Sequence, residues 1–203
     1  MNYMVNIMLK DWRFQMNRLE IFSKELSLIK NIEIRKFVEA CLNEAPEYFF
    51  TVAASSTGKY HPGYALGEGG LVRHTQAATR IAYELFRTEM YPYNQDQQDL
   101  ILASLILHDS RKHGNNGSRF TVVEHPILAA EAIRKSQGVI NPEWREIIAK
   151  NIETHMGRWT TDYKSNREVL QKPSTGMQKF VHQCDYLASR KCLEFNFDVE
   201  LSQ

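Results

Sequence analysis

Apolar side chains recur at helical spacing through most of this chain, and this periodicity constrains the fold more than any other feature. In the segment that starts at Leu71, the apolar residues Ala78, Ala82, Leu85 and Phe86 follow the repeat that places side chains on one face of a helix. No segment shows a convincing alternation of apolar and polar residues, which is the pattern of a half-buried strand. The sequence therefore predicts an all-α fold built as a helical bundle.

The expected helices are separated by proline, glycine and asparagine-rich turns. They cover Trp12 to Ile29, Ile34 to Leu42, Leu71 to Met90, Gln97 to Leu107, Pro126 to Ser136, Asn141 to His155, and a last helix that begins at Ser174. Between Tyr48 and Gly70 the helical pattern is interrupted, and we expect a long loop there. Long loops in compact domains are usually functional or disordered, and because this one runs into a histidine we expect a functional loop.

Length, charge and cysteine content limit the class of protein. The 203 residues fit one domain with an added helical segment, and we expect residues 1–45 to pack as an N-terminal helical segment on a core of residues 46–203. A net charge of +1 is not the basic footprint of a duplex-DNA binder. The three cysteines have no paired short spacing and no apolar run is long enough for a membrane span, so we expect a cytoplasmic protein with reduced thiols.

Histidine and aspartate residues lie on, or at the ends of, the predicted helices. They are His74, the adjacent pair His108 and Asp109, His125, His155 and Asp185. An ionisable side chain directed at a core needs a partner, and imidazole and carboxylate together suit divalent transition metals. Taken singly, each residue also has an ordinary explanation, such as a hydrogen-bonded core histidine, a charged helix end or a surface carboxylate.

The order of these residues resembles the HD-domain metal-dependent phosphohydrolases. The resemblance extends from Tyr60 to Lys191 and rests on the runs GLVRHT, LHDSRK, HP, HMG and HQCDY, which carry the histidines and aspartates in the order of that superfamily. The chain is most similar to the HD domains of bacterial 3′-5′ exoribonucleases and to small phage HD proteins. The resemblance implies an HD-domain helical bundle.

The resemblance also implies two metal ions. His74, His108, Asp109 and Asp185 would hold the first ion, and His125 and His155 would hold the second, with Asp109 bridging. Two such ions lower the pKa of a shared water, and the resulting hydroxide can attack phosphorus. Histidine-rich ligation favours Mn, Fe, Co or Ni, and it disfavours Mg, which prefers oxygen ligands.

Several basic and aromatic residues are candidates for contact with a substrate. By resemblance, Lys112 is expected to approach the substrate phosphate and to act with Asp109 in catalysis. The other candidates are Arg158, which follows the HMG run, and the loop residues Lys59, Tyr60 and His61, which would form a substrate wall. His113 and His182 lie near the motifs, and we expect both to face solvent.

The implied activity is hydrolysis of a phosphate ester in a nucleotide, a cyclic nucleotide or dinucleotide, or a short oligonucleotide. Three alternatives stay open: a single-metal nucleoside mono- or triphosphate phosphohydrolase, a 3′-5′ exonuclease, and a non-catalytic nucleotide-binding module. The related exoribonucleases carry an added barrel that binds single strands, and this chain is too short and too helical to contain one. The sequence suggests a bacterial or phage source and does not decide whether the chain forms a homo-oligomer.

Overall fold

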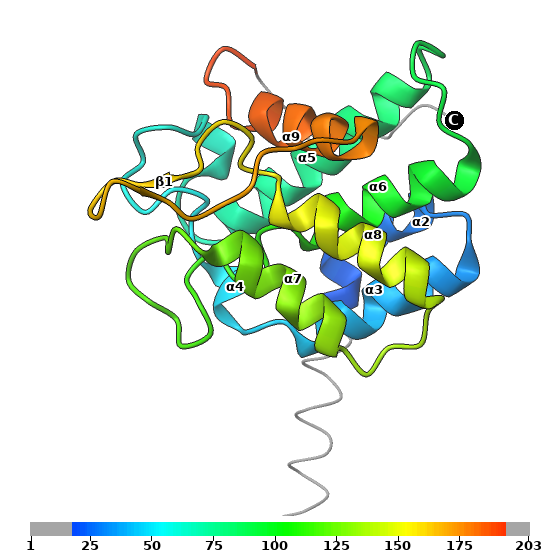
Figure 1. The fold of residues 1–203 in the computed structure, drawn as a ribbon, viewed down its shortest axis with the longest axis horizontal. Helices are drawn as coiled ribbons and strands as arrows, with labels where there is room; N and C mark the ends of the chain where they lie inside the picture. Colours follow the sequence, from blue (N-terminus) through cyan, green and yellow to red (C-terminus); the bar gives the residue numbers. More distant parts are fainter. Residues whose placement is uncertain (1–17, 194–203) are drawn as a thin grey trace, which may run out of the picture.

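The computed structural model describes residues 18–193, and these residues form an all-α bundle (Figure 1). The predicted fold class is therefore confirmed. The helices are α2 (Ser23–Leu28), α3 (Ile32–Glu44), α4 (Tyr48–Thr51), the 3-10 helix η1 (Gly63–Ala65), α5 (Gly70–Phe86), α6 (Gln95–Leu107), α7 (His125–Lys135), α8 (Pro142–Glu153) and α9 (Gly176–Ala188). Two short strands, β1 (Thr161–Asp162) and β2 (Arg167–Glu168), form a hairpin before α9.

Helix α6 lies at the centre of the bundle. Every residue from Asp99 to Leu107 is buried, and the helix packs against α3, α5, α8 and α9. In Figure 1, α5 and α9 lie together above α6, and α3 lies below it. A helix that is apolar on all sides is stable only when other elements surround it. The C-terminal end of α6 is consequently held deep inside the molecule, and this end carries His108.

The described part of the N-terminal segment packs on the bundle and shares its core. The helix predicted for Trp12 to Ile29 lies partly outside the described residues, and its described part is not continuous. Residues 18–21 are helical, a turn follows at Phe22, and α2 starts at Ser23. The buried ring of Phe22 stacks on Phe49 at this turn, so tertiary packing overrides the local helical pattern.

The segment from Tyr48 to Gly70 is less irregular than predicted, since it contains α4 and η1. Arg73 in α5 holds it in place by donating hydrogen bonds to the backbone carbonyls of Tyr64, Leu66 and Glu68. Gly70 allows close contact at the start of α5, because a Cβ atom there would lie 2.2 Å from the carbonyl oxygen of Ala65. The segment is therefore folded back onto the helix that carries His74.

The β1–β2 hairpin was not predicted. It pairs Thr161 with Glu168 and Asp162 with Arg167 in antiparallel register. The Asp162 carboxylate accepts hydrogen bonds from the backbone N–H groups of Lys164 and Ser165, which closes the turn. Strands of two residues are too short to produce a recognisable alternation, so the turn chemistry determines this element. Among the described residues, no helix is long and apolar enough to cross a membrane.

Candidate metal centre

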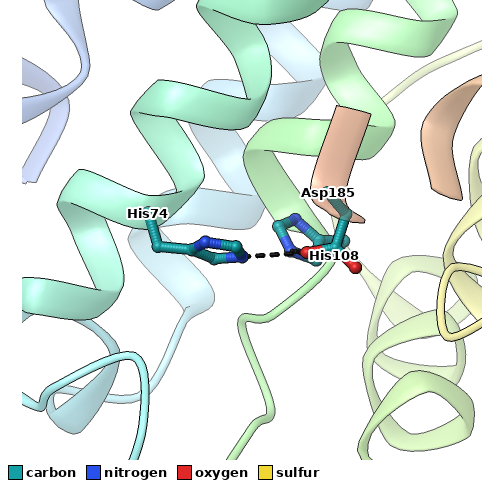
Figure 2. Close-up of side chains that lie close together, drawn as sticks. All are labelled: His74, His108 and Asp185. Carbon is teal, nitrogen blue, oxygen red and sulfur yellow. Dashed lines mark hydrogen bonds and ion pairs between the residues drawn. The ribbon is translucent and has the colours of Figure 1, made fainter. Parts of the chain in front are cut away.

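The bundle brings the six predicted metal ligands together at one place, which we call the donor cluster. His74 comes from α5, His108 and Asp109 from the end of α6, His125 from the first residue of α7, His155 from the turn after α8, and Asp185 from α9. Figure 2 shows the side chains of His74, His108 and Asp185 pointing toward one another. The cluster is enclosed, because the first five residues are at most 2% exposed and the Asp185 side chain is 17% exposed.

One part of the donor cluster, the first set, consists of His74, His108 and Asp185. The Nε2 atoms of His74 and His108 lie 2.9 Å and 3.5 Å from Asp185 Oδ1. One oxygen of Asp109, Oδ2, faces the same histidines, at 3.8 Å from His74 Nε2 and 3.5 Å from His108 Nε2. Two imidazoles and two carboxylates therefore converge on one small volume.

The second set consists of His125 and His155. Their Nε2 atoms lie 3.2 Å apart, and they are 3.2 Å and 3.7 Å from Asp109 Oδ1. The two oxygens of Asp109 thus face different pairs of histidines, Oδ2 toward the first set and Oδ1 toward the second. This is the arrangement of a carboxylate that can bridge two cations.

Backbone hydrogen bonds orient three of the four imidazoles. The Nδ1 atoms of His108, His125 and His155 each lie 2.7 Å from the backbone carbonyl three residues earlier. A carbonyl only accepts, so Nδ1 carries the proton, and in the neutral ring the Nε2 lone pair points into the donor cluster. Hydrogen bonds of this kind, made by the ring nitrogen that does not bind the metal, fix the tautomer and orientation of metal-binding histidines.

Burial and neighbouring charge shift the pKa values in the cluster in opposite directions. Burial disfavours a charged His108, but the carboxylates of Asp109 and Asp185 raise its pKa above the ordinary value. Burial also disfavours a charged Asp109, yet Lys112 and His108 hold the pKa of its carboxyl well below the usual range. For His155, burial and the neighbouring His108 lower the pKa to about 3. The cluster therefore combines ionised carboxylates with at least one neutral imidazole.

The chemistry of the donor cluster fits divalent transition-metal ions. Among the described residues, the buried atoms His108 Nε2 and Asp109 Oδ1, which face the donor cluster, have no hydrogen-bond partner, and this is costly for polar atoms inside a protein. Ligand atoms of His74, His108 and Asp185 lie within 4.8 Å of one another, as do those of His108, Asp109 and His155. Imidazole nitrogens and carboxylate oxygens are the donors that Mn, Fe, Co and Ni accept.

The predicted substrate-contact residues do not all reach the cluster. Lys112 does: it is 8% exposed, and its Nζ donates a hydrogen bond to Asp109 Oδ2. His61 does as well, since its ring packs edge-on against His74 with centroids 4.9 Å apart. Burial, together with His74 and Lys112, lowers the pKa of His61 to about 3. Lys59 and Tyr60 are instead exposed and pair with each other.

Arg158 is exposed and lies over the neighbouring ring of Trp159, outside the donor cluster. The expectation that His113 faces solvent was wrong, and His182 is only partly exposed. His113 is 7% exposed and stacks on Tyr48. His182 is half-buried, and its Nδ1 lies 2.7 Å from the backbone oxygen of His155.

His182 supports the turn that carries the metal-ligand candidate His155, and this role was not predicted from the sequence. Its partner is a main-chain carbonyl 27 residues away, for which a sequence has no side-chain signal.

Comparisons with protein-family models, with curated proteins and with solved structures found no match to this chain.

Proposed function

We propose that this protein is a phosphohydrolase that cleaves a phosphate ester with two divalent transition-metal ions. His74, His108, Asp109 and Asp185 would hold one ion, and His125 and His155 would hold the other together with Asp109. Mn, Fe, Co and Ni suit this donor set better than Mg, which prefers oxygen ligands and keeps its waters.

The single observation that carries the proposal is the position of Asp109. Its Oδ2 lies 3.5 Å from His108 Nε2, and its Oδ1 lies 3.2 Å from His125 Nε2. A carboxylate that offers one oxygen to each of two histidine pairs is suited to two ions, whereas a single-ion site needs only one of these groups. Two-metal sites of this kind are typical of phosphatases and nucleases.

The chain's own residues support phosphate chemistry. When bound, the ions supply an activated water and neutralise charge on phosphate oxygens. Lys112 holds its ammonium group beside Asp109, where it can bind a phosphate oxygen as a point charge. The His61 ring packs edge-on against His74, where it can limit the access of bulk water to the first set.

Metal content is the first test. We expect about two manganese ions per chain after loading and desalting, because two donor sets are present. The double variant His125→Gln/His155→Gln should retain about one ion, since the first set is intact. His113→Gln is the matched control, because this buried histidine lies outside the donor cluster, and it should bind as the unmodified chain does. One ion per chain in the unmodified protein would favour the single-metal nucleoside phosphohydrolase instead.

Turnover is the second test. The manganese-loaded protein should be screened against nucleotides, cyclic nucleotides and dinucleotides, and short RNA and DNA, with the products identified. We expect hydrolysis of a phosphate ester bond in at least one of these classes, and loss of that activity in Asp109→Asn. Stepwise release of mononucleotides from a 3′ end would identify an exonuclease. Absence of hydrolysis across the screen would refute the proposal and favour a non-catalytic binding module.

A further inference from the structure

The Lys112 ammonium contacts the oxygen of Asp109 that faces the first set. Its Nζ donates a hydrogen bond to Asp109 Oδ2, and the same oxygen lies 3.8 Å from His74 Nε2 and 3.5 Å from His108 Nε2. Lys112 is 8% exposed and Asp109 is 1% exposed, so the pair is shielded from bulk water. The oxygen that Asp109 offers to the first set is therefore already paired with a positive charge.

The two oxygens of Asp109 differ in this respect. Oδ1 faces His125 Nε2 at 3.2 Å, and among the described residues it has no hydrogen-bond partner. Oδ2, by contrast, accepts the hydrogen bond from Lys112. The chain therefore supplies its own cation to the oxygen of the first set.

This cation offsets a concentration of buried negative charge. Oxygens of Asp109 and Asp185 each lie 3.5 Å from His108 Nε2, so two carboxylates share the interior of the donor cluster. Burial of charged groups is costly unless each group has a partner. With Lys112 in place, the donor cluster can form before any ion arrives.

An ion in the first set would compete with the ammonium for Asp109, because both are cations. Like charges held close together in a buried site repel each other strongly. The Lys112 backbone is fixed, since its N–H donates to the Asp109 carbonyl and its own carbonyl accepts from Val122, both at 3.0 Å. Its side chain has a flexible four-carbon stem, so the ammonium can move while the main chain keeps its position.

We propose that Lys112 is a displaceable counter-cation for the first set. Its ammonium pairs with Asp109 in the metal-free chain and leaves Oδ2 when an ion binds there. This inference rests on the proposed function for the presence of the ion, and it adds a form of regulation to that site. The charge of Lys112 becomes available to an anionic ligand only after the ion has replaced it on Asp109.

Lys112 could instead stay on Asp109 as a permanent part of the site. The two roles predict different effects of Lys112→Met, which removes the charge and keeps a flexible, unbranched side chain. A permanent partner that orients Asp109 predicts equal or weaker manganese binding by the variant. A displaceable counter-cation predicts tighter binding, because the ion no longer competes with the ammonium.

The first experiment compares manganese affinity and metal-free stability of the full chain by calorimetry. Lys112→Met should bind manganese about tenfold more tightly, from the usual effect of one nearby charge on a buried carboxylate. In chelator the variant should melt about 5 °C lower, because Asp109 has lost its counter-charge. Lys135→Met is the matched control, because Lys135 pairs with Glu131 on the surface, and it should change neither quantity. Equal or weaker manganese binding by Lys112→Met would overturn the proposal.

A second experiment needs no variant, so it decides the question even if Lys112→Met does not fold. Acetylation of amines, followed by mass spectrometry, reports the accessibility of each lysine in the unmodified chain. Lys112 should react slowly in chelator, because it is 8% exposed, and several-fold faster once manganese is bound. Lys135 has a side chain that is 77% exposed and should react equally in both conditions. Manganese binding without faster reaction at Lys112 would overturn the proposal.

The displacement of Lys112 and the proposed hydrolase can fail separately, because neither experiment needs turnover. Tighter manganese binding by Lys112→Met, in a chain that hydrolyses nothing, would support the displacement and refute the hydrolase. Hydrolysis by a chain whose Lys112 reacts equally with and without manganese would support the hydrolase and overturn the displacement.

Discussion

At the scale of single residues, Gly157 makes possible the turn after α8, which carries His155. Its φ of +62° lies in the left-handed region, and a Cβ atom would fall 2.2 Å from the His182 ring. We expect Gly157→Ala to lower the free energy of unfolding by about 2 kcal/mol through backbone strain and displacement of His182. Denaturant unfolding measures this. Gly63→Ala is the control, since a Cβ there meets no described atom within 4 Å; equal losses in both variants would contradict the argument.

The three thiols should differ in reactivity at the same scale. Burial raises the pKa of Cys41 to about 12 and raises that of Cys184 as well, whereas Cys192 is exposed. Because the thiolate is the reactive form, a disulfide reagent at neutral pH should label Cys192 in the native chain and all three thiols only after unfolding. The Cys192→Ser variant should then show no labelling under native conditions. Rapid native labelling of Cys41 or Cys184 would show that the core opens more readily than its packing implies.

At the scale of secondary-structure elements, helix ends position the donors. His108 follows the last residue of α6, His125 begins α7, and His155 follows α8. The last carbonyls of a helix have no partner within it, and those of Leu105 and Ile152 accept from the imidazoles three residues later. The same contact satisfies the helix end and orients a metal-ligand candidate. This is why a change at a helix end is expected to disturb the site more than a change in the middle of a helix.

A buried ion pair between elements ties α2 to α5. Glu25 is fully buried, and it accepts a hydrogen bond at 2.8 Å from Arg80, which is 3% exposed. Glu25→Ala takes the carboxylate from a buried ion pair, so it should destabilise the fold by about 3 kcal/mol. The exposed pair of Glu84 and Arg87 is the control, and Glu84→Ala should cost less than about 1 kcal/mol. Thermal or denaturant unfolding compares the two variants; a loss for Glu25→Ala as small as that for Glu84→Ala would mean that the buried pair adds little to stability.

At the scale of the whole molecule, apolar periodicity predicted the helices that form the bundle, because helices such as α5 and α8 bury one face. Apolar periodicity failed to predict the structure where a contact between residues distant in sequence determines the local conformation. The helix expected up to Ile29 breaks at Phe22 because Phe49 packs there, and the hairpin depends on the Asp162 side chain.

For the candidate site, the order of histidines and aspartates predicted which side chains converge through its resemblance to the HD-domain phosphohydrolases. The orientation of the side chains in the loop between Tyr48 and Gly70 could not be predicted from the sequence. The loop turns His61 inward while Lys59 and Tyr60 stay exposed.

The donor cluster joins α5, α6, α7, α9 and the turn after α8, so metal binding should stabilise the whole molecule. An ion at a hundredfold excess over its dissociation constant adds about 2.7 kcal/mol, provided that the unfolded chain does not bind it. For a chain of this size we expect manganese to raise the melting temperature by about 5–10 °C. Calorimetric scans with manganese and with a chelator measure the shift.

Asp109→Asn should abolish this thermal shift, because it removes the charge that faces both sets of histidines. Glu131→Gln removes an exposed carboxylate on α7 and should leave the shift intact. If Asp109→Asn kept the full shift, manganese would be acting at the surface, and the donor cluster would be a hydrogen-bonded core. If the shift disappears only in Asp109→Asn, the helices are held together by the ions that their ends bind.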